Sequence, residues 1–97
     1  MPDESQNMFH YVYILVSLKD KRFYIGSTRD LKRRISEHLA GKVKSTKNRL
    51  PLKLICYEAY LTKEEAQKRE RYLKSSDGRK EMYIRFAKSL EKIGIKE

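Results

Sequence analysis

Three stretches of the chain are rich in β-branched and aromatic residues, a composition typical of β-strands. They cover residues 11–16, 22–26 and 52–60. The first two are separated by the polar residues 19–21, a link short enough for a hairpin but too short for a crossover, so we expect these strands to be antiparallel. Pro51 precedes the third strand, where its missing N–H is tolerated.

Between the second and third strands, the apolar spacing predicts an amphipathic helix. Leu31, Ile35 and Leu39 fall on one helical face. Asp30 can cap the start of this helix, and Gly41 is a natural stop. The helix is followed by a segment, residues 42–50, that contains basic residues and no acid. We call this segment the basic loop.

The remainder of the chain predicts two further helices. Thr62 and Glu65 form a capping box at the start of the first, and residues 75–78 interrupt it. The apolar face of the last helix consists of Met82, Phe86, Leu90 and Ile93. The predicted order β-β-α-β-α-α describes an α+β fold, a three-stranded antiparallel sheet flanked by helices. We expect residues 1–8 to be a flexible leader and residues 9–95 to form a single domain.

Composition narrows the function classes. The 97 residues include 23 Lys and Arg against 13 Asp and Glu, which gives a net charge of +10 and indicates a polyanionic partner such as nucleic acid. No apolar run approaches the roughly 20 residues that span a bilayer, so we expect no membrane insertion. The single cysteine, Cys56, cannot form an internal disulfide, which favours a reducing, cytoplasmic setting.

Helical geometry singles out three polar residues beside apolar faces. Arg34 and His38 are i, i+4 neighbours along the apolar stripe of the first helix, and Glu70 lies on the packed face of the second. Geometry alone favours an arginine lying along the core edge and a buried, hydrogen-bonded histidine. For Glu70 the alternatives are a salt bridge, to Arg34 or a neighbouring basic residue, and a metal ligand.

Three tyrosines are concentrated in the predicted hairpin: Tyr11, Tyr13 and Tyr24. If the hairpin loop consists of residues 19–20, Tyr13 pairs with Gly26 and shares a face with Tyr24 as a diagonal neighbour. A loop of one more residue would separate the two rings. Aromatic strand residues are otherwise ordinary core residues.

Together these residues resemble the GIY-YIG nuclease family. Tyr24-Ile25-Gly26 is the second signature intact, and Tyr11-Val12-Tyr13 is similar to the first, with the leading glycine replaced. Residues 27–34 look like the stretch that leads into the family's catalytic arginine, and residues 66–74 look like its metal-binding helix. The basic loop is similar to that of small stand-alone bacterial members. The complete set of motifs also resembles the N-terminal nuclease domain of the excision-repair incision subunit.

The resemblance implies a metal-dependent DNA endonuclease that hydrolyses phosphodiester bonds and is directed by DNA structure or damage in repair. It implies Tyr13, Tyr24, Arg34 and His38 as catalytic residues and Glu70 as ligand of one divalent ion, Mg²⁺ or Mn²⁺. Either tyrosine is a candidate for the general base. The chain has no asparagine after Glu70, where many members carry one. The alternative function is therefore a catalytically silent nucleic-acid-binding module on the same fold.

We expect polar residues outside the two signatures to bind the substrate. Phosphate contacts carry no base identity, so we expect recognition of DNA shape, with RNA as the alternative polymer. We expect no small-molecule substrate, and a monomer or weak homodimer. The residues predicted to contact nucleic acid are Lys42, Lys44, Thr46, Lys47, Arg49 and Arg79.

Overall fold

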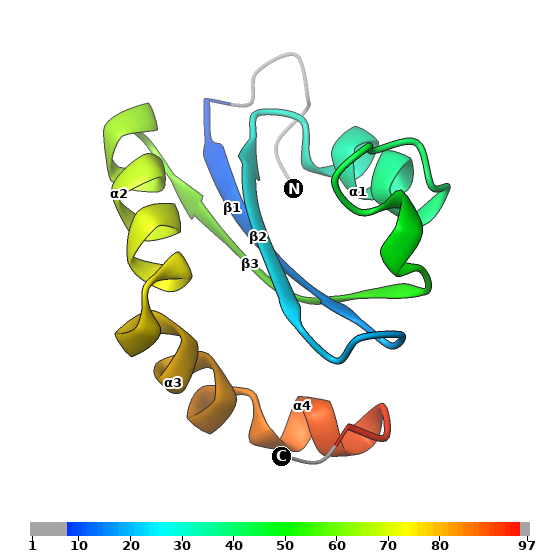
Figure 1. The fold of residues 1–97 in the computed structure, drawn as a ribbon. Coiled ribbons are helices and arrows are strands. Elements are labelled where there is room, and N and C mark those ends of the chain that lie inside the picture. Colours follow the sequence, from blue (N-terminus) through cyan, green and yellow to red (C-terminus); the bar gives the residue numbers. More distant parts are fainter. Residues whose placement is uncertain (1–7, 96–97) are drawn as a thin grey trace.

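Strand β1 (His10–Ser17) is the centre of an antiparallel sheet of order β2-β1-β3 in the computed structural model (Figure 1). Its neighbours are β2 (Phe23–Thr28) and β3 (Leu52–Tyr60). Strand β1 is buried on both faces, which explains why its sequence is a continuous apolar run instead of an alternating one. The structure describes residues 8–95, so the predicted leader lies outside the described residues except for Met8.

The hairpin has the register predicted from the sequence, although residues 18–22 connect the two strands instead of residues 19–20 alone. Tyr13 pairs with Gly26, and Leu15 pairs with Tyr24. Tyr13 and Tyr24 are therefore diagonal neighbours on one face, with ring centroids 6.4 Å apart.

Helix α1 (Leu31–Leu39) and the basic loop cover this face of the sheet, and the loop contains a short 3₁₀ helix, η2 (Lys47–Arg49) (Figure 1). The Asp30 side chain caps α1 by accepting from the N–H of Arg33, as predicted. The prediction that Leu39 belongs to the packed face is wrong, because its side chain is 49% exposed. His38, one position earlier, is fully buried under the helix instead.

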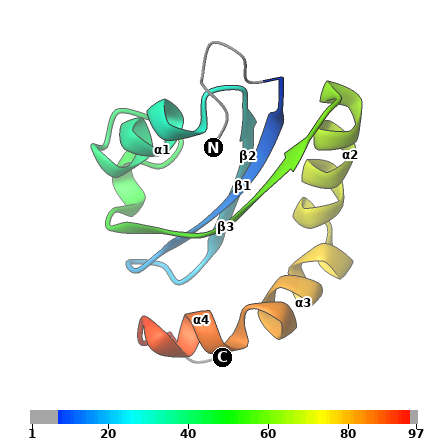
Figure 2. The same ribbon diagram turned by 180° about the vertical axis from the view of Figure 1, so that it is seen from behind.

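The opposite face of the sheet packs against an arc formed by α2 (Lys63–Lys74), α3 (Ser76–Arg85) and α4 (Ala87–Lys92) (Figures 1 and 2). The capping box is present, since Thr62 accepts from the N–H of Glu65 and donates to its carboxylate. Only Ser75 separates α2 from α3, so the predicted interruption is shorter than residues 75–78. The predicted last helix is divided at Phe86, whose backbone leaves the helical region.

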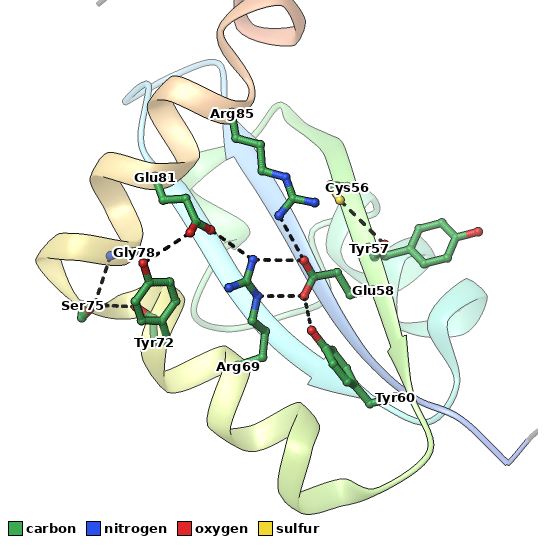
Figure 3. Close-up of polar contacts among 10 residues, drawn as sticks. All are labelled: Cys56, Tyr57, Glu58, Tyr60, Arg69, Tyr72, Ser75, Gly78, Glu81 and Arg85. Atoms are coloured by element: carbon green, nitrogen blue, oxygen red, sulfur yellow. Dashed lines mark hydrogen bonds and ion pairs between the residues drawn. The ribbon is translucent and has the colours of Figure 1, made fainter.

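An ion-pair network fixes the arc to the sheet. Glu58 on β3 accepts from Arg69 of α2, 3.0 Å away, and from Arg85 of α3, 3.4 Å away (Figure 3). Arg69 also contacts Glu81 of α3 at 3.1 Å. Because α2 carries Glu70, the residue next to Arg69, this network helps to set where that carboxylate lies.

The predicted α+β fold is confirmed, with α3 and α4 together in place of the last predicted helix. Among residues 8–95, no helix combines the length and the apolar composition that crossing a membrane requires.

Candidate active site

A buried chain of hydrogen bonds joins β1, α1 and the basic loop. The hydroxyl of Tyr13 lies 2.8 Å from Nε2 of His38, and Nδ1 of the same ring lies 2.8 Å from the hydroxyl of Thr46. All three side chains are fully buried. Since each end of the imidazole has a partner, the ring is held in one orientation.

Gly26 provides the space that Tyr13 occupies. A Cβ atom at position 26 would collide with the hydroxyl oxygen and ring of Tyr13. The pairing of these two residues across the hairpin brings them together. The second signature therefore needs a glycine at this position so that the tyrosine of the first signature fits.

Tyr24 lies at the open side of the cluster. Its ring centroid is 5.1 Å from that of His38, and the side chain is half-buried. Its hydroxyl accepts a hydrogen bond from the exposed Ser45 at 3.2 Å. Of the two tyrosines predicted to be catalytic, Tyr13 and Tyr24, it is thus Tyr24 that solvent reaches.

Arg34 brings a positive charge to the same cluster. Its guanidinium is half-buried, pairs with Glu37 at 3.3 Å, and interacts with the phenol of Tyr13. The Tyr13 interaction is the main cause that raises the pKa of Arg34, with Glu37 adding to it. The guanidinium therefore stays charged, with a forked donor set next to the tyrosines.

Burial shifts the pKa values of both ring residues beneath Arg34. Desolvation raises the pKa of Tyr13 above its ordinary value of 10.0, although Arg34 opposes the shift. Desolvation, followed by the charge of Arg34, lowers the pKa of His38 below 6.5. At neutral pH, Tyr13 is a neutral phenol and His38 a neutral imidazole.

Glu70 reaches the end of β2 from helix α2. Its carboxylate accepts from the hydroxyl of Ser27 at 2.7 Å and from the ammonium of Lys74 at 2.8 Å. Of the salt bridges considered for Glu70, the structure shows the one with a neighbouring basic residue and not the one with Arg34. Burial raises the pKa of Glu70, but the two donors outweigh it and the net pKa is lowered. Glu70 is therefore ionised at neutral pH.

The chemistry of Glu70 fits one hard divalent cation. The Glu70 carboxylate is an ionised oxygen donor, and its side chain is 20% exposed. A cation, the Lys74 ammonium, already lies against it. Residues 8–95 contain no group of three or more His, Cys, Asp or Glu side chains placed to share a metal ion. A metal here would therefore depend on a single protein carboxylate, with water and substrate oxygens completing its shell.

The residues predicted to contact nucleic acid separate into two groups. Thr46 is buried behind the site and bonds His38, and Arg49 pairs with Asp20 at 2.6 Å, so the structure uses both to hold the loop in place. Thr46 does not lie on the surface where a phosphate contact was expected. The side chains that remain exposed are Lys42, Lys44, Lys47 and Arg79.

Sequence reasoning missed three residues that touch the site. Lys74 follows Glu70 at i+4, and this helical ion-pair spacing could have revealed it. Ser27 and Ser45 approach Glu70 and Tyr24 from distant parts of the chain, and the sequence carries no local signal for either contact.

The fold and the site define a protein of the GIY-YIG class. The family model described as "GIY-YIG catalytic domain" matches residues 9–83. The chain belongs to this family, and the resemblance inferred from the signatures is confirmed.

Relatives within the family are small proteins of about the same extent. A UPF0213 protein of Haloquadratum walsbyi is 43% identical over 70 residues, which are 71% of this chain and 78% of the relative. UPF0213 protein YazA of Bacillus subtilis is 43% identical over 83 residues, 84% of this chain and 81% of the relative. The solution NMR structure of UPF0213 protein BH0048 from Bacillus halodurans aligns with a TM-score of 0.50 at 41% identity, covering 77% of this chain and 82% of that one.

Proposed function

We propose that the protein is a metal-dependent DNA endonuclease that hydrolyses phosphodiester bonds in DNA repair or processing. One observation carries the proposal: the ring of Tyr13 packs against that of Tyr24 with centroids 6.4 Å apart, and Arg34 and Glu70, which come from two further elements, both act on the pKa of its phenol. A fold needs no such convergence of a phenol, a guanidinium and a carboxylate for stability. This set of side chains matches what phosphodiester hydrolysis requires. The reaction needs a group that activates the water, a cation that stabilises the phosphate and a ligand for the metal ion.

Arg34 serves the phosphate in this proposal. Its guanidinium cannot lose its proton, and its fork of donors suits two phosphate oxygens at once. The Glu37 pair leaves the side chain half-exposed, so a phosphate can reach it. As charge builds on the phosphate oxygens in the transition state, these donors stabilise it.

Glu70 would hold the divalent ion, Mg²⁺ or Mn²⁺. When bound, the ion would supply Lewis-acid stabilisation of the charge that develops on the phosphate. Lys74, whose side chain is 54% exposed, would have to release its oxygen of Glu70 for the ion to bind there. Ser27 then keeps the carboxylate oriented through its remaining hydrogen bond.

Tyr24 is the better placed of the two tyrosines to accept the proton of the attacking water, a step that requires the phenolic proton of Tyr24 to have passed to solvent beforehand. Tyr13 is fully buried, its pKa is raised, and its hydroxyl is engaged with His38. The hydroxyl of Tyr24 lies at the open side and contacts only the exposed Ser45 among the hydrogen bonds of the described residues. We therefore assign the base to Tyr24, with Tyr13 and His38 orienting it by packing against its ring.

The exposed cations extend this site into a nucleic-acid surface. Lys42, Lys44 and Lys47 project from the basic loop, and Arg79 projects from α3. Contacts of this kind go to the phosphate backbone, so selectivity comes from the shape or damage of the DNA.

The direct test is a nicking assay on branched, damaged and single-stranded DNA with Mg²⁺ or Mn²⁺. We expect cleavage by the unaltered chain and its loss, by about 100-fold or more, in Arg34→Ala and Glu70→Gln. Lys88→Ala on α4 is the matched control, because it removes one exposed charge away from the site. Absence of cleavage on every substrate, or full activity in Glu70→Gln, would overturn the proposal.

One observation favours a second candidate, a binding module without turnover. Both carboxylate oxygens of Glu70 have protein partners, which a silent descendant of a nuclease would tolerate. This candidate predicts salt-dependent DNA binding that is unchanged by Glu70→Gln and is never followed by cleavage.

A further inference from the structure

A cavity of about 670 Å³ lies between the outer edge of β2 and the helices α2 and α3. Its volume falls within the range of roughly 300–1,000 Å³ that is typical of small-ligand sites. The floor is apolar and comes from the protein core, as Ile25, Leu73 and Met82 are all buried. Of the predicted catalytic and nucleic-acid-binding residues, Tyr24, Arg49 and Arg79 line this cavity.

One wall of the cavity is aromatic. The rings of Phe23 and Tyr83 have centroids 5.0 Å apart and are tilted by 57°, so they pack on each other as one continuous wall. Both side chains are half-buried, which leaves part of the wall open to the cavity. Aromatic walls of this kind accept flat rings by stacking.

The rim of the cavity is positive. Arg22 and Arg79 are exposed there, and Lys74 lies beside them. The only acid among the lining residues, Asp20, is already neutralised by Arg49 at 2.6 Å. The preferred occupant therefore combines a flat apolar ring with a negative charge, as a nucleotide does.

The cavity adjoins the candidate active site through two residues. Tyr24 lines the cavity and packs against His38, and Lys74 lines the cavity and binds Glu70. A strand whose phosphate lies at Arg34 and Glu70 would therefore pass beside this cavity, because Lys74 belongs both to its lining and to the ion pair of Glu70.

We propose that this cavity binds one unpaired nucleotide of DNA beside the bond to be cut, with its base against Phe23 and Tyr83 and its phosphate at Arg22 and Arg79. A base inside a duplex is stacked and paired and cannot enter without flipping out. The substrate class is then DNA with an unpaired nucleotide next to the cut, as at a flap, gap or single-stranded junction. The position of the strand rests on the proposed function, whereas the binding itself does not.

The test measures binding without cleavage, in EDTA, with the full chain. The probes are a duplex with a short single-stranded overhang carrying 2-aminopurine, the same overhang with abasic sites, and a fully paired duplex of equal length. We expect the 2-aminopurine overhang to bind at least about 5-fold more tightly than the other two, the lower bound for stacking one base, with its fluorescence quenched.

Two variants test whether the preference for the overhang arises in the cavity. Arg22→Gln, at an exposed position, and Tyr83→Leu, checked for folding by circular dichroism, should each remove most of the preference for the overhang. The matched controls are Lys88→Gln, a lysine on α4, and Ile84→Ala, a 79% exposed neighbour of Tyr83 that does not line the cavity. Both controls should keep the preference.

Equal affinity for the three probes, or equal binding of the abasic and the 2-aminopurine overhangs, would overturn the inference even if the protein cleaves DNA. A cavity-dependent preference for the overhang, found in a protein that never cleaves, would uphold the inference and remove the proposed endonuclease function.

Discussion

The Nδ1 atom of His38 and the hydroxyl oxygen of Thr46 lie 2.8 Å apart, and neither side chain is exposed. This bond ties the basic loop to the ring cluster beneath it. The preceding residue, Ser45, makes the corresponding contact to Tyr24. Two consecutive hydroxyl residues therefore connect the loop that carries the exposed lysines to both parts of the aromatic site.

The direction of this hydrogen-bond chain is set by the tautomer of His38. With the proton of the neutral imidazole on Nδ1, the ring donates to Thr46 and its Nε2 accepts from the hydroxyl of Tyr13. With the proton on Nε2, both directions are reversed, since each hydroxyl can donate or accept.

Replacing Thr46 by valine should lower the free energy of unfolding by about 1–3 kcal/mol, because Nδ1 of His38 loses its partner in the interior. Thr46→Ser keeps a hydroxyl at the same place and should recover most of the loss. Urea denaturation measures both variants, and ¹⁵N NMR reports which nitrogen of His38 carries the proton. Equal stability of the valine and serine variants would contradict the role of this bond.

The stability of the protein should fall as the pH drops below about 6.5, because burial depresses the pKa of His38 in the folded state. The unfolded chain then binds a proton that the folded chain does not, so this contribution is present above pH 6.5 and is lost toward the folded pKa. Urea denaturation across this range measures the slope. His38→Gln, which does not titrate, should have a smaller slope; an unchanged slope would rule out His38 as its source.

How much of the site the sequence predicts depends on how local each contact is. The hairpin register brings Tyr13 opposite Gly26 as predicted, although the connection between β1 and β2 is longer than the two residues on which that prediction depended. The place of Thr46 could not be predicted, because a threonine in a run of basic residues has the same local pattern whether it points outward or inward. Its direction is set by the packing of the loop on α1.

The same distinction explains the errors in the helices. The spacing of Leu31, Ile35 and Leu39 predicts the helix correctly, but Leu39 in its last turn is 49% exposed, and the adjacent His38 takes the buried position. The break at Phe86 has no glycine or proline to announce it. It follows from the curvature of the arc around the sheet, which is a property of the tertiary structure (Figure 1).

Adding a single methyl group at Gly26 should disturb the site. In Gly26→Ala the new Cβ collides with the ring and hydroxyl of Tyr13, which has no free space to move into. We expect a loss of about 1–3 kcal/mol in the free energy of unfolding, typical of overpacking, by urea denaturation. If the collision is the cause, Tyr13→Leu combined with Gly26→Ala should lose less than the sum of the single changes. Strict additivity would exclude this explanation.

Removing Lys74 should strengthen metal binding at Glu70. The ammonium competes for the carboxylate at 2.8 Å, so Lys74→Ala frees one oxygen and removes a nearby positive charge. We expect Mn²⁺ to bind several-fold more tightly, measured by calorimetry or electron paramagnetic resonance without DNA. Lys68→Ala on the same helix removes an equal charge from an exposed position and is the control. Weaker Mn²⁺ binding in Lys74→Ala would contradict the competition.

Tyr60 should make the protein sensitive to alkali. Burial, followed by its hydrogen bond of 2.7 Å to Glu58, raises the pKa of Tyr60 from 10.0 to about 12 (Figure 3). Because the folded pKa is the higher one, this contribution to stability is complete below pH 10 and is lost as the pH rises from 10 through 12. A spectroscopic titration of phenolate absorbance should show a late step, to which the buried Tyr13 also contributes, and Tyr60→Phe should reduce its amplitude by one tyrosine. Tyr57→Phe on the same strand is the control, since that ring packs against Tyr11, and it should leave the amplitude of the late step unchanged. An undiminished late step in Tyr60→Phe would contradict the raised pKa of Tyr60.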